Sequence, residues 1–100
     1  IYKLASKLHL DENIANSAYN ILTLAKEEGK TAGKNPTGLV ASAIYLASSI
    51  NGLQLTQRKI CLAADITEAT IRNNNKNLKK ILIKNPQYME KIKKNSRHKL

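Results

Sequence analysis

The spacing of apolar residues predicts a chain built from helices. From Asp11 to Gly29 the apolar positions recur every three or four residues, which is typical of one face of an amphipathic helix. Asp is a good N-cap residue, and Gly favours the left-handed conformation that ends many helices. The opening residues, "IYKLASKLHL", also resemble a helix, and no segment has a convincing strand pattern. The recurring apolar positions are Ile14, Ala18, Ile21 and Ala25.

The segment from Pro36 to Asn51, "PTGLVASAIYLASSIN", is apolar or small on almost every side. Asn35 before Pro36 matches an N-cap followed by proline at the first helical position, and Gly52 follows the end of the segment. A helix without a polar face is normally enclosed by other helices. We therefore expect this helix to form the centre of the fold.

Two helices joined by a tight turn are predicted from residue 56 to residue 83. Thr56 suits the N-cap of the first helix and Thr67 that of the second, which runs to about Ile83. Asp65 stands in the turn, where this kind of motif often needs a left-handed residue, and Asp is one of the few residues besides Gly that adopt that conformation. Ala63 is small enough for the helices to cross closely. These features predict a helix-turn-helix.

The chain is expected to form one all-α domain of five helices at residues 1–83, followed by a basic C-terminal extension at 84–100. One hundred residues allow a single core. Pro86 permits a weakly amphipathic last helix, "PQYMEKIKKNS", with Tyr88, Met89 and Ile92 on one side. Because the chain opens within a helical pattern, we expect a fragment of a longer protein.

Charge is distributed unevenly along the chain. The formal net charge is +10, yet residues 1–28 are close to neutral, with three lysines and four carboxylates. Residues 56–100 carry twelve basic residues against three acidic ones. Such a basic half attracts polyanions. Because it coincides with the predicted helix-turn-helix, nucleic acid is favoured over a merely solvated surface.

Other kinds of site receive little support from the sequence. No apolar run reaches the roughly 18 residues of a membrane span, and a single cysteine fits a reducing intracellular setting. His9 and His98 lie at opposite ends of the chain, and Cys61 has no Cys or His at ligand spacing. Cys61 is better explained as a small core residue than as a nucleophile. We expect no enzyme, no metal and no cofactor.

The helix after Thr67 has two distinct sides when residues advance by about 100° each. Ile71, Leu78, Ile81 and Leu82 cluster on the side that must pack on the core. In a major groove, Arg pairs with guanine, Asn with adenine, and a methyl group contacts thymine. Lysines further along the helix more naturally meet phosphates. The outward side carries Ala69, Arg72, Asn73, Lys76 and Lys80, with Thr70 and Lys79 at its margins.

Two blocks of the sequence resemble the second cyclin-like repeat of transcription factor B, the archaeal relative of eukaryotic transcription factor IIB. One is a basic-x-Pro segment that opens the small-residue helix containing "AIYLAS". The other is the T-x-x-x-I cap and turn that ends in "TEATIRN". The resemblance covers roughly residues 1–83. The zinc ribbon and the first cyclin repeat of the family are absent, as expected of a fragment.

The resemblance implies a five-helix cyclin-like fold and a role in transcription initiation. Factors of this family bind a promoter already bent by TATA-binding protein, and they help to recruit RNA polymerase. Their second repeat reads a short element upstream of the TATA box, which sets promoter polarity. The implied partners are double-stranded promoter DNA, TATA-binding protein and RNA polymerase, with no membrane. The implied location is the archaeal cytoplasm at the nucleoid, or the nucleus of a eukaryote.

The resemblance also assigns roles to residues. Ala69, Thr70 and Arg72 match the base-reading end of the family's recognition helix, and Asn73 shares their outward side. The expected phosphate contacts are Lys34, Thr56, Arg58, Lys59, Lys76, Lys79 and Lys80. After "TIRN" the family usually has a basic and then an aromatic residue, whereas this chain has Asn74 and Asn75. Their position beside the apolar side predicts a loss of buried area, about 1–2 kcal/mol on transfer scales.

Two other function classes remain open at this point. Cyclin-like helical domains also bind proteins, and the central helix would serve that purpose equally well. An ordinary helix-turn-helix repressor is the other class, but it normally binds a palindrome as a dimer. The sequence offers no clear dimerisation helix, so a monomer is expected.

Overall fold

The computed structural model describes residues 1–53 and 55–88. Its described part contains five helices, in the order α1 (Tyr2–Lys7), α2 (Glu12–Glu27), α3 (Pro36–Ile50), α4 (Gln57–Ala64) and α5 (Glu68–Lys84). These bounds confirm the predicted all-helical fold to within about a residue at each end. The last predicted helix lies outside the described residues from Met89 onward.

The N-cap residues expected from the sequence all cap their helices. Asp11 accepts a hydrogen bond from the backbone N–H of Asn13, and Asn35 accepts one from that of Thr37. Thr56 caps α4 and Thr67 caps α5 in the same way. Each cap satisfies a backbone donor that has no partner inside its helix, which fixes where the helix begins.

Gly29 ends α2 in the left-handed conformation, with φ of +69°. The next N–H, of Lys30, bonds back to the carbonyl of Ala25 at 2.9 Å, and that of Gly29 bonds to Lys26 at 3.0 Å. This pair of bonds is a Schellman motif, which needs a residue that tolerates positive φ. The chain therefore turns sharply here and enters the connection to α3.

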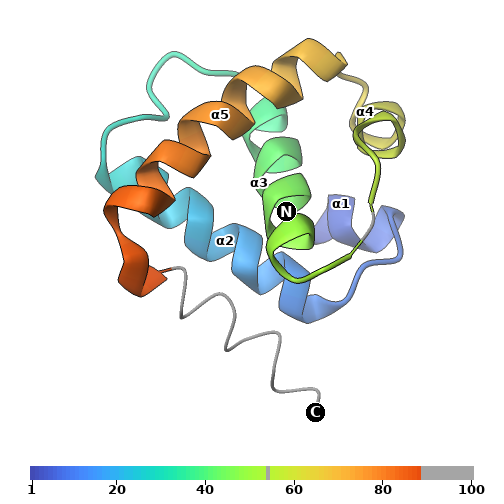
Figure 1. Cartoon of the computed structure of the whole chain (residues 1–100). Coiled ribbons are helices and arrows are strands. Elements are labelled where there is room, and N and C mark those ends of the chain that lie inside the picture. Colours follow the sequence, from blue (N-terminus) through green and yellow to red (C-terminus); the bar gives the residue numbers. More distant parts are fainter. Residues whose placement is uncertain (54, 89–100) are drawn as a thin grey trace.

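Helix α3 is the centre of the fold, as its apolar sequence predicted. It packs most extensively on α2 and α5 and also contacts α4, and Figure 1 shows it enclosed by the other helices. The main core lies between α2, α3 and α5, with Ile21, Ile44 and Leu82 among its fully buried side chains. Tyr88 also packs against this core, and its hydroxyl donates to Glu27 at 3.4 Å.

Gly38 of α3 lies in close contact with α5. A Cβ at this position would lie 2.9 Å from Cγ2 of Thr70 and 3.3 Å from Nδ2 of Asn74. The first distance is too short for a real carbon–carbon contact, so only glycine fits without movement. The missing side chain therefore sets the position of α5 on α3.

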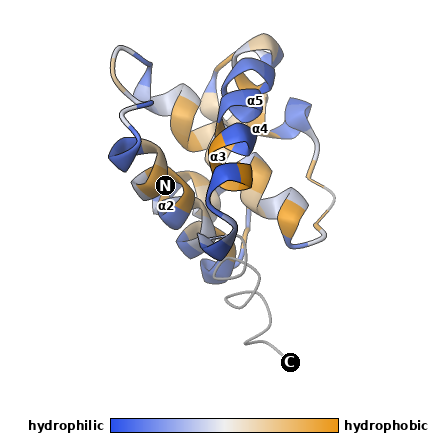
Figure 2. Ribbon diagram, turned by 60° about the vertical axis from the view of Figure 1, so that its left-hand side comes forward, coloured by the Kyte–Doolittle hydropathy of each residue, from blue (hydrophilic) through white to orange (hydrophobic). Residues whose placement is uncertain are grey.

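No helix in the described part of the chain is both long and apolar enough to cross a membrane. Figure 2 shows hydrophobic residues on the inner parts of the helices and a strongly hydrophilic outer side on α5. That outer side of α5 is part of the candidate functional site.

Candidate nucleic-acid interface

Helices α4 and α5 form the predicted helix-turn-helix. Asp65, between them, adopts the left-handed conformation with φ of 57° and ψ of 53°. The N–H of Ile66 then bonds to the carbonyl of Cys61 at 3.2 Å, which closes the end of α4. The hydroxyl of Thr67 accepts from the N–H of Thr70 at 3.2 Å and starts α5. The turn is thus defined by Asp65, which adopts the left-handed conformation, and by Thr67, which caps α5.

A second core cluster holds this motif against the rest of the domain. Its buried members are Ala41 from α3, Ile60 and Cys61 from α4, and Ile71 from α5. Burial raises the pKa of the Cys61 thiol, Glu68 raises it further, and Arg72 opposes the shift. Cys61 is therefore a protonated core residue near neutral pH, as its sequence context predicted. No group of three metal-ligating side chains occurs in the described part of the chain.

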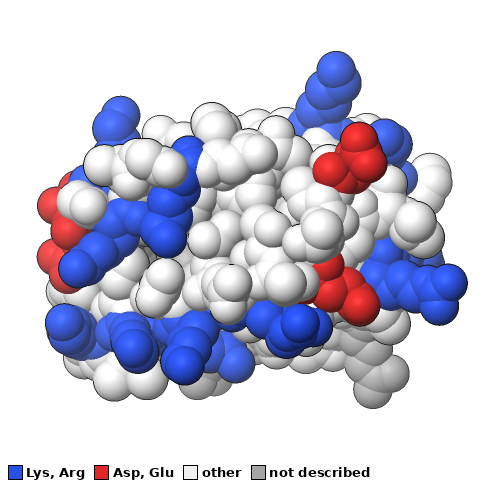
Figure 3. Space-filling model, turned by 90° about the horizontal axis from the view of Figure 1, so that it is seen from above, with Lys and Arg blue, Asp and Glu red and all other residues white. Residues whose placement is uncertain are grey.

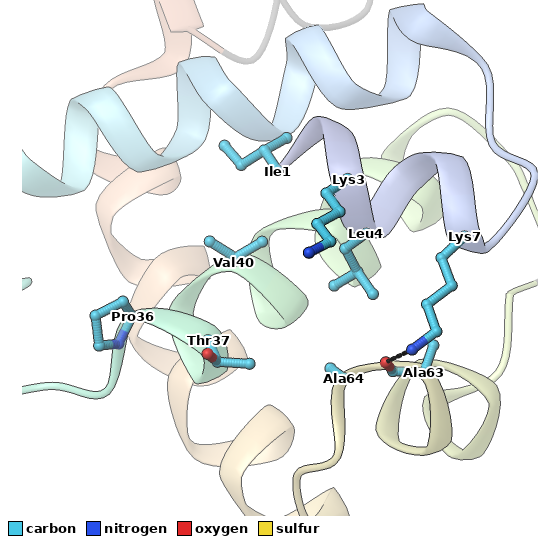
Figure 4. A pocket seen from close by; sticks show the side chains of 9 residues that line it. All are labelled: Ile1, Lys3, Leu4, Lys7, Pro36, Thr37, Val40, Ala63 and Ala64. Carbon is cyan, nitrogen blue, oxygen red and sulfur yellow. Dashed lines mark hydrogen bonds between the residues drawn. The ribbon is translucent and has the colours of Figure 1, made fainter.

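Helix α1 supports the end of α4 from the other side. The ammonium group of Lys7 donates a hydrogen bond to the carbonyl oxygen of Ala63 at 3.0 Å, across a hollow of about 340 Å³ (Figure 4). Ile1, Leu4 and Val40 give this hollow an apolar lining. Ala63 and Ala64 line it as well, and Ala64 also packs against the second core cluster.

The outward side of α5 is exposed as the helical wheel predicted. The side chains of Ala69, Arg72, Asn73, Lys76 and Lys80 are all exposed, while Ile71 and Leu78 are buried. Lys79, at the margin, is exposed too. The N-terminal half of this face offers a guanidinium, an amide and a methyl group, the three kinds of group that read base edges in a major groove.

Thr70 is oriented differently from the other three candidate base-reading residues. Its side chain is half-buried, and its hydroxyl oxygen lies 2.9 Å from that of Thr67. Its Cγ2 methyl, expected to face a thymine methyl, faces Gly38 on α3. The lack of a side chain at Gly38 leaves room for this methyl group, and its contact with a thymine methyl stays a prediction.

The candidate phosphate-contacting residues lie on several segments. Thr56, Arg58 and Lys59 are exposed at the start of α4, and the Thr56 hydroxyl accepts from the N–H of Lys59 at 3.2 Å. Lys34 is exposed in the α2–α3 connection. Figure 3 shows Lys and Arg side chains gathered along one margin of the face that it displays, with few acidic groups between them.

The two asparagines that depart from the family pattern are buried. Asn74 is 9% exposed and Asn75 is 7% exposed. Nδ2 of Asn74 lies near Gly38, and Oδ1 of Asn75 has no hydrogen-bond partner among the described residues. Both side chains belong to the packed side of α5, so neither is available to a groove.

The sequence reasoning did not identify three residues that shape this region. Gly38 was assigned no role, although a glycine within a helix costs about 1 kcal/mol relative to alanine and so signals a packing requirement. Lys30 and Lys84 were not selected either, and both line a cleft with Lys34 and Lys80. No local pattern links the connection after α2 to the end of α5.

Comparison with known proteins identifies the family. A family model described as "Transcription factor TFIIB repeat" matches residues 1–81. "Transcription initiation factor IIB" of Caldivirga maquilingensis is 47% identical over 80 residues, which cover 80% of this chain and 24% of that protein. The protein of the same name from Pyrobaculum islandicum is 45% identical over 82 residues, covering 82% of this chain and 25% of that protein.

The same name is carried by a Pyrococcus furiosus protein that is 44% identical over 87 residues, which cover 86% of this chain and 29% of that protein. The chain thus spans roughly a quarter of the length of the first of these relatives. The family match and the strand-free described structure together confirm the predicted all-α, cyclin-like repeat. This chain belongs to the transcription factor TFIIB repeat family.

Proposed function

We propose that this chain is the second cyclin-like repeat of a transcription initiation factor and binds promoter DNA upstream of the TATA box, in complex with TATA-binding protein. The observation that carries the proposal is the exposed N-terminal half of α5 in a capped helix-turn-helix. Ala69, Arg72 and Asn73 project there with no packing role. The names of the relatives, all transcription initiation factors, support the same role.

In the proposed complex, the start of α5 enters the major groove and its other basic residues meet the backbone. Arg72 would pair with the O6 and N7 atoms of guanine, and Asn73 with the N6 and N7 atoms of adenine. Thr70 would hold the start of the helix through Thr67. The phosphate contacts would come from Lys34, Thr56, Arg58, Lys59, Lys76, Lys79 and Lys80. Binding in one orientation would set promoter polarity and help to recruit RNA polymerase.

A gel-shift comparison tests this function. The chain is mixed with TATA-binding protein and either a promoter duplex or a duplex whose bases upstream of TATA are scrambled. We expect weaker binding to the scrambled duplex at the same salt concentration, because the phosphates are unchanged and only the base edges differ. Equal binding to both duplexes would contradict base reading by α5.

The second candidate function is a protein-interaction module, and the hollow beside α1 is the observation that favours it (Figure 4). Its apolar lining is flanked by Lys3 and Lys7. Replacing Lys3, an exposed residue of α1 (Lys3→Glu), changes the charged rim of this hollow without altering α5. If that variant lost promoter binding while Arg72→Ala kept it, the interaction module would replace the proposed DNA reader.

A further inference from the structure

A basic cleft of about 370 Å³ lies between the α2–α3 connection and the C-terminal half of α5. Lys30 and Lys34 enter it from the connection, and Lys80 and Lys84 from α5. Asn77 adds a neutral amide, and Glu28 is the one acidic residue in the lining. Two segments that are far apart in the sequence thus bring four lysines to the lining of one cleft.

The described residues do not neutralise the charge of this cleft. Among the residues that the structure describes, none of the four lysines forms an ion pair, although Glu28 lies in the same lining. The neighbouring carboxylate of Glu27 instead accepts the hydroxyl of Tyr88. Four like charges around one carboxylate repel each other, so an anion that enters the cleft gains attraction and relieves that repulsion.

The position of the cleft along α5 indicates which anion it meets. A helix rises about 1.5 Å per residue, so Lys84 lies about 18 Å along the axis from Arg72. The major groove is about 12 Å wide. When the start of α5 occupies the groove and the helix axis crosses the groove, the far end of the helix lies beyond the groove edge, where the sugar–phosphate backbone runs. The amide of Asn77 suits a phosphate oxygen as well.

We propose that this cleft, formed by Lys30, Lys34, Lys80 and Lys84, binds a backbone phosphate of the DNA whose bases α5 reads. The inference rests on the proposed function and extends it, since Lys30 and Lys84 become DNA contacts and the connection after α2 becomes part of the interface. The cleft fixes how far α5 enters the groove, because it clamps the backbone at a set distance from Arg72.

The main test is the salt dependence of DNA binding by Lys30→Ala/Lys84→Ala. Each phosphate neutralised by a protein contributes about 0.9 to the slope of log affinity against log salt on duplex DNA. We expect the double variant to lose roughly one unit of slope. The matched control is Lys3→Ala/Lys26→Ala, which removes the same charge from exposed residues of α1 and α2 that do not line the cleft. That control should keep the slope.

A second measurement locates the phosphate. Single methylphosphonate groups, which lack the charge, replace phosphates along the promoter duplex one at a time. One replacement beside the read bases should weaken the wild-type chain and leave Lys30→Ala/Lys84→Ala unaffected. Equal responses at every position, or an unchanged salt slope, would overturn the phosphate clamp. A loss that appears only with TATA-binding protein and leaves the slope intact would assign the cleft to an acidic protein surface and overturn it too.

These measurements separate phosphate binding by the lysine cleft (the phosphate clamp) from the proposed function. If scrambling the upstream bases changes nothing while the double variant still loses slope, base reading fails and the phosphate clamp stands. If scrambling weakens binding while the slope is unchanged in the double variant, base reading stands and the clamp fails. Thermal unfolding followed by circular dichroism should be the same for all variants, because the substituted lysines are exposed.

Discussion

The two faces of α5 carry the same residue type in opposite environments. Asn73 and Asn77 are exposed, while Asn74 and Asn75 are buried between them at 9% and 7% exposure. On the buried face, α3 approaches so closely that Gly38 has no room for a Cβ. On the exposed face, the side chains of Asn73 and Asn77 are open to solvent. Position on the helix, and not residue type, therefore decides what each asparagine does.

This difference separates stability from recognition within one helix. The buried face determines where α5 sits, because its apolar residues belong to both core clusters. The exposed face contributes little to folding, so its residues are free to serve a ligand. Substitutions on opposite faces should consequently change different measured quantities, even when the residues are adjacent.

Ile71→Ala should cause a large loss of folding stability. Ile71 is 0% exposed and joins α5 to α3 and α4 in the second core cluster. Truncating a fully buried isoleucine costs about 2–5 kcal/mol. Arg72→Ala, at the next residue, should change the free energy of unfolding by only about 0.5 kcal/mol or less. Urea denaturation measures both values. Similar losses in the two variants would contradict the assignment of the faces.

Arg72→Ala should instead lower DNA affinity in a sequence-dependent way. Loss of a bidentate contact to guanine costs about 1–3 kcal/mol and relaxes specificity at one base position. Lys80→Ala is the comparison, because a phosphate contact should weaken binding to all sequences alike and reduce the salt dependence. Fluorescence anisotropy with single-base variants of the duplex distinguishes them. Identical profiles would show that the division between base and phosphate contacts is wrong.

Local backbone chemistry explains why much of the fold was predictable. The caps at Asp11, Asn35, Thr56 and Thr67 and the left-handed residue at Asp65 each act within a few positions of the chain. Their hydrogen bonds depend only on neighbouring residues, so a single sequence contains the signal. The two-sided character of α5 followed from helical periodicity in the same way.

Features that depend on distant segments were not predictable from such signals. The methyl of Thr70 faces α3 because Gly38, far earlier in the chain, leaves space for it. The basic cleft needs the connection after α2 to lie beside the end of α5. Helical periodicity placed Asn74 and Asn75 beside the apolar side, but the depth of their burial depends on how closely α3 approaches. These facts belong to packing and not to local sequence.

Asn75→Leu should stabilise the domain and thereby test the buried face directly. Oδ1 of Asn75 is buried without a hydrogen-bond partner among the described residues, which costs about 1–3 kcal/mol. Leucine has the same number and branching of side-chain heavy atoms and removes that polar atom, so we expect a gain of roughly 1–2 kcal/mol in the free energy of unfolding. Asn77→Leu, on the exposed face, should give no such gain. Destabilisation by Asn75→Leu would mean that its amide has a role that the packing does not reveal.

Gly38→Ala should destabilise the domain even though alanine is the better helix former. Helix propensity alone would favour alanine by about 1 kcal/mol. Overpacking against Cγ2 of Thr70, 2.9 Å from the new Cβ, costs about 1–3 kcal/mol. We expect a net loss of about 1 kcal/mol from these opposing effects. Thr70→Ser removes that methyl and keeps the hydroxyl, so the double variant should recover the loss. If the double variant did not recover stability, the steric conflict at residue 38 would involve atoms other than the Thr70 methyl.

Cys61→Ala should have the smallest effect on the free energy of unfolding, and this effect should appear only at alkaline pH. Burial raises the pKa of its thiol above the ordinary value of 9.0, with a further increase from Glu68. The folded state therefore holds the thiol proton more tightly than the unfolded state. This contribution to stability is complete below the unfolded pKa and is lost as the pH rises through the folded pKa. Denaturation measured below and at successive pH values above the ordinary thiol pKa of 9.0 follows this loss. Cys61→Ala should lose stability less steeply there than the unmodified chain, and parallel curves would show that the thiol does not respond to its burial.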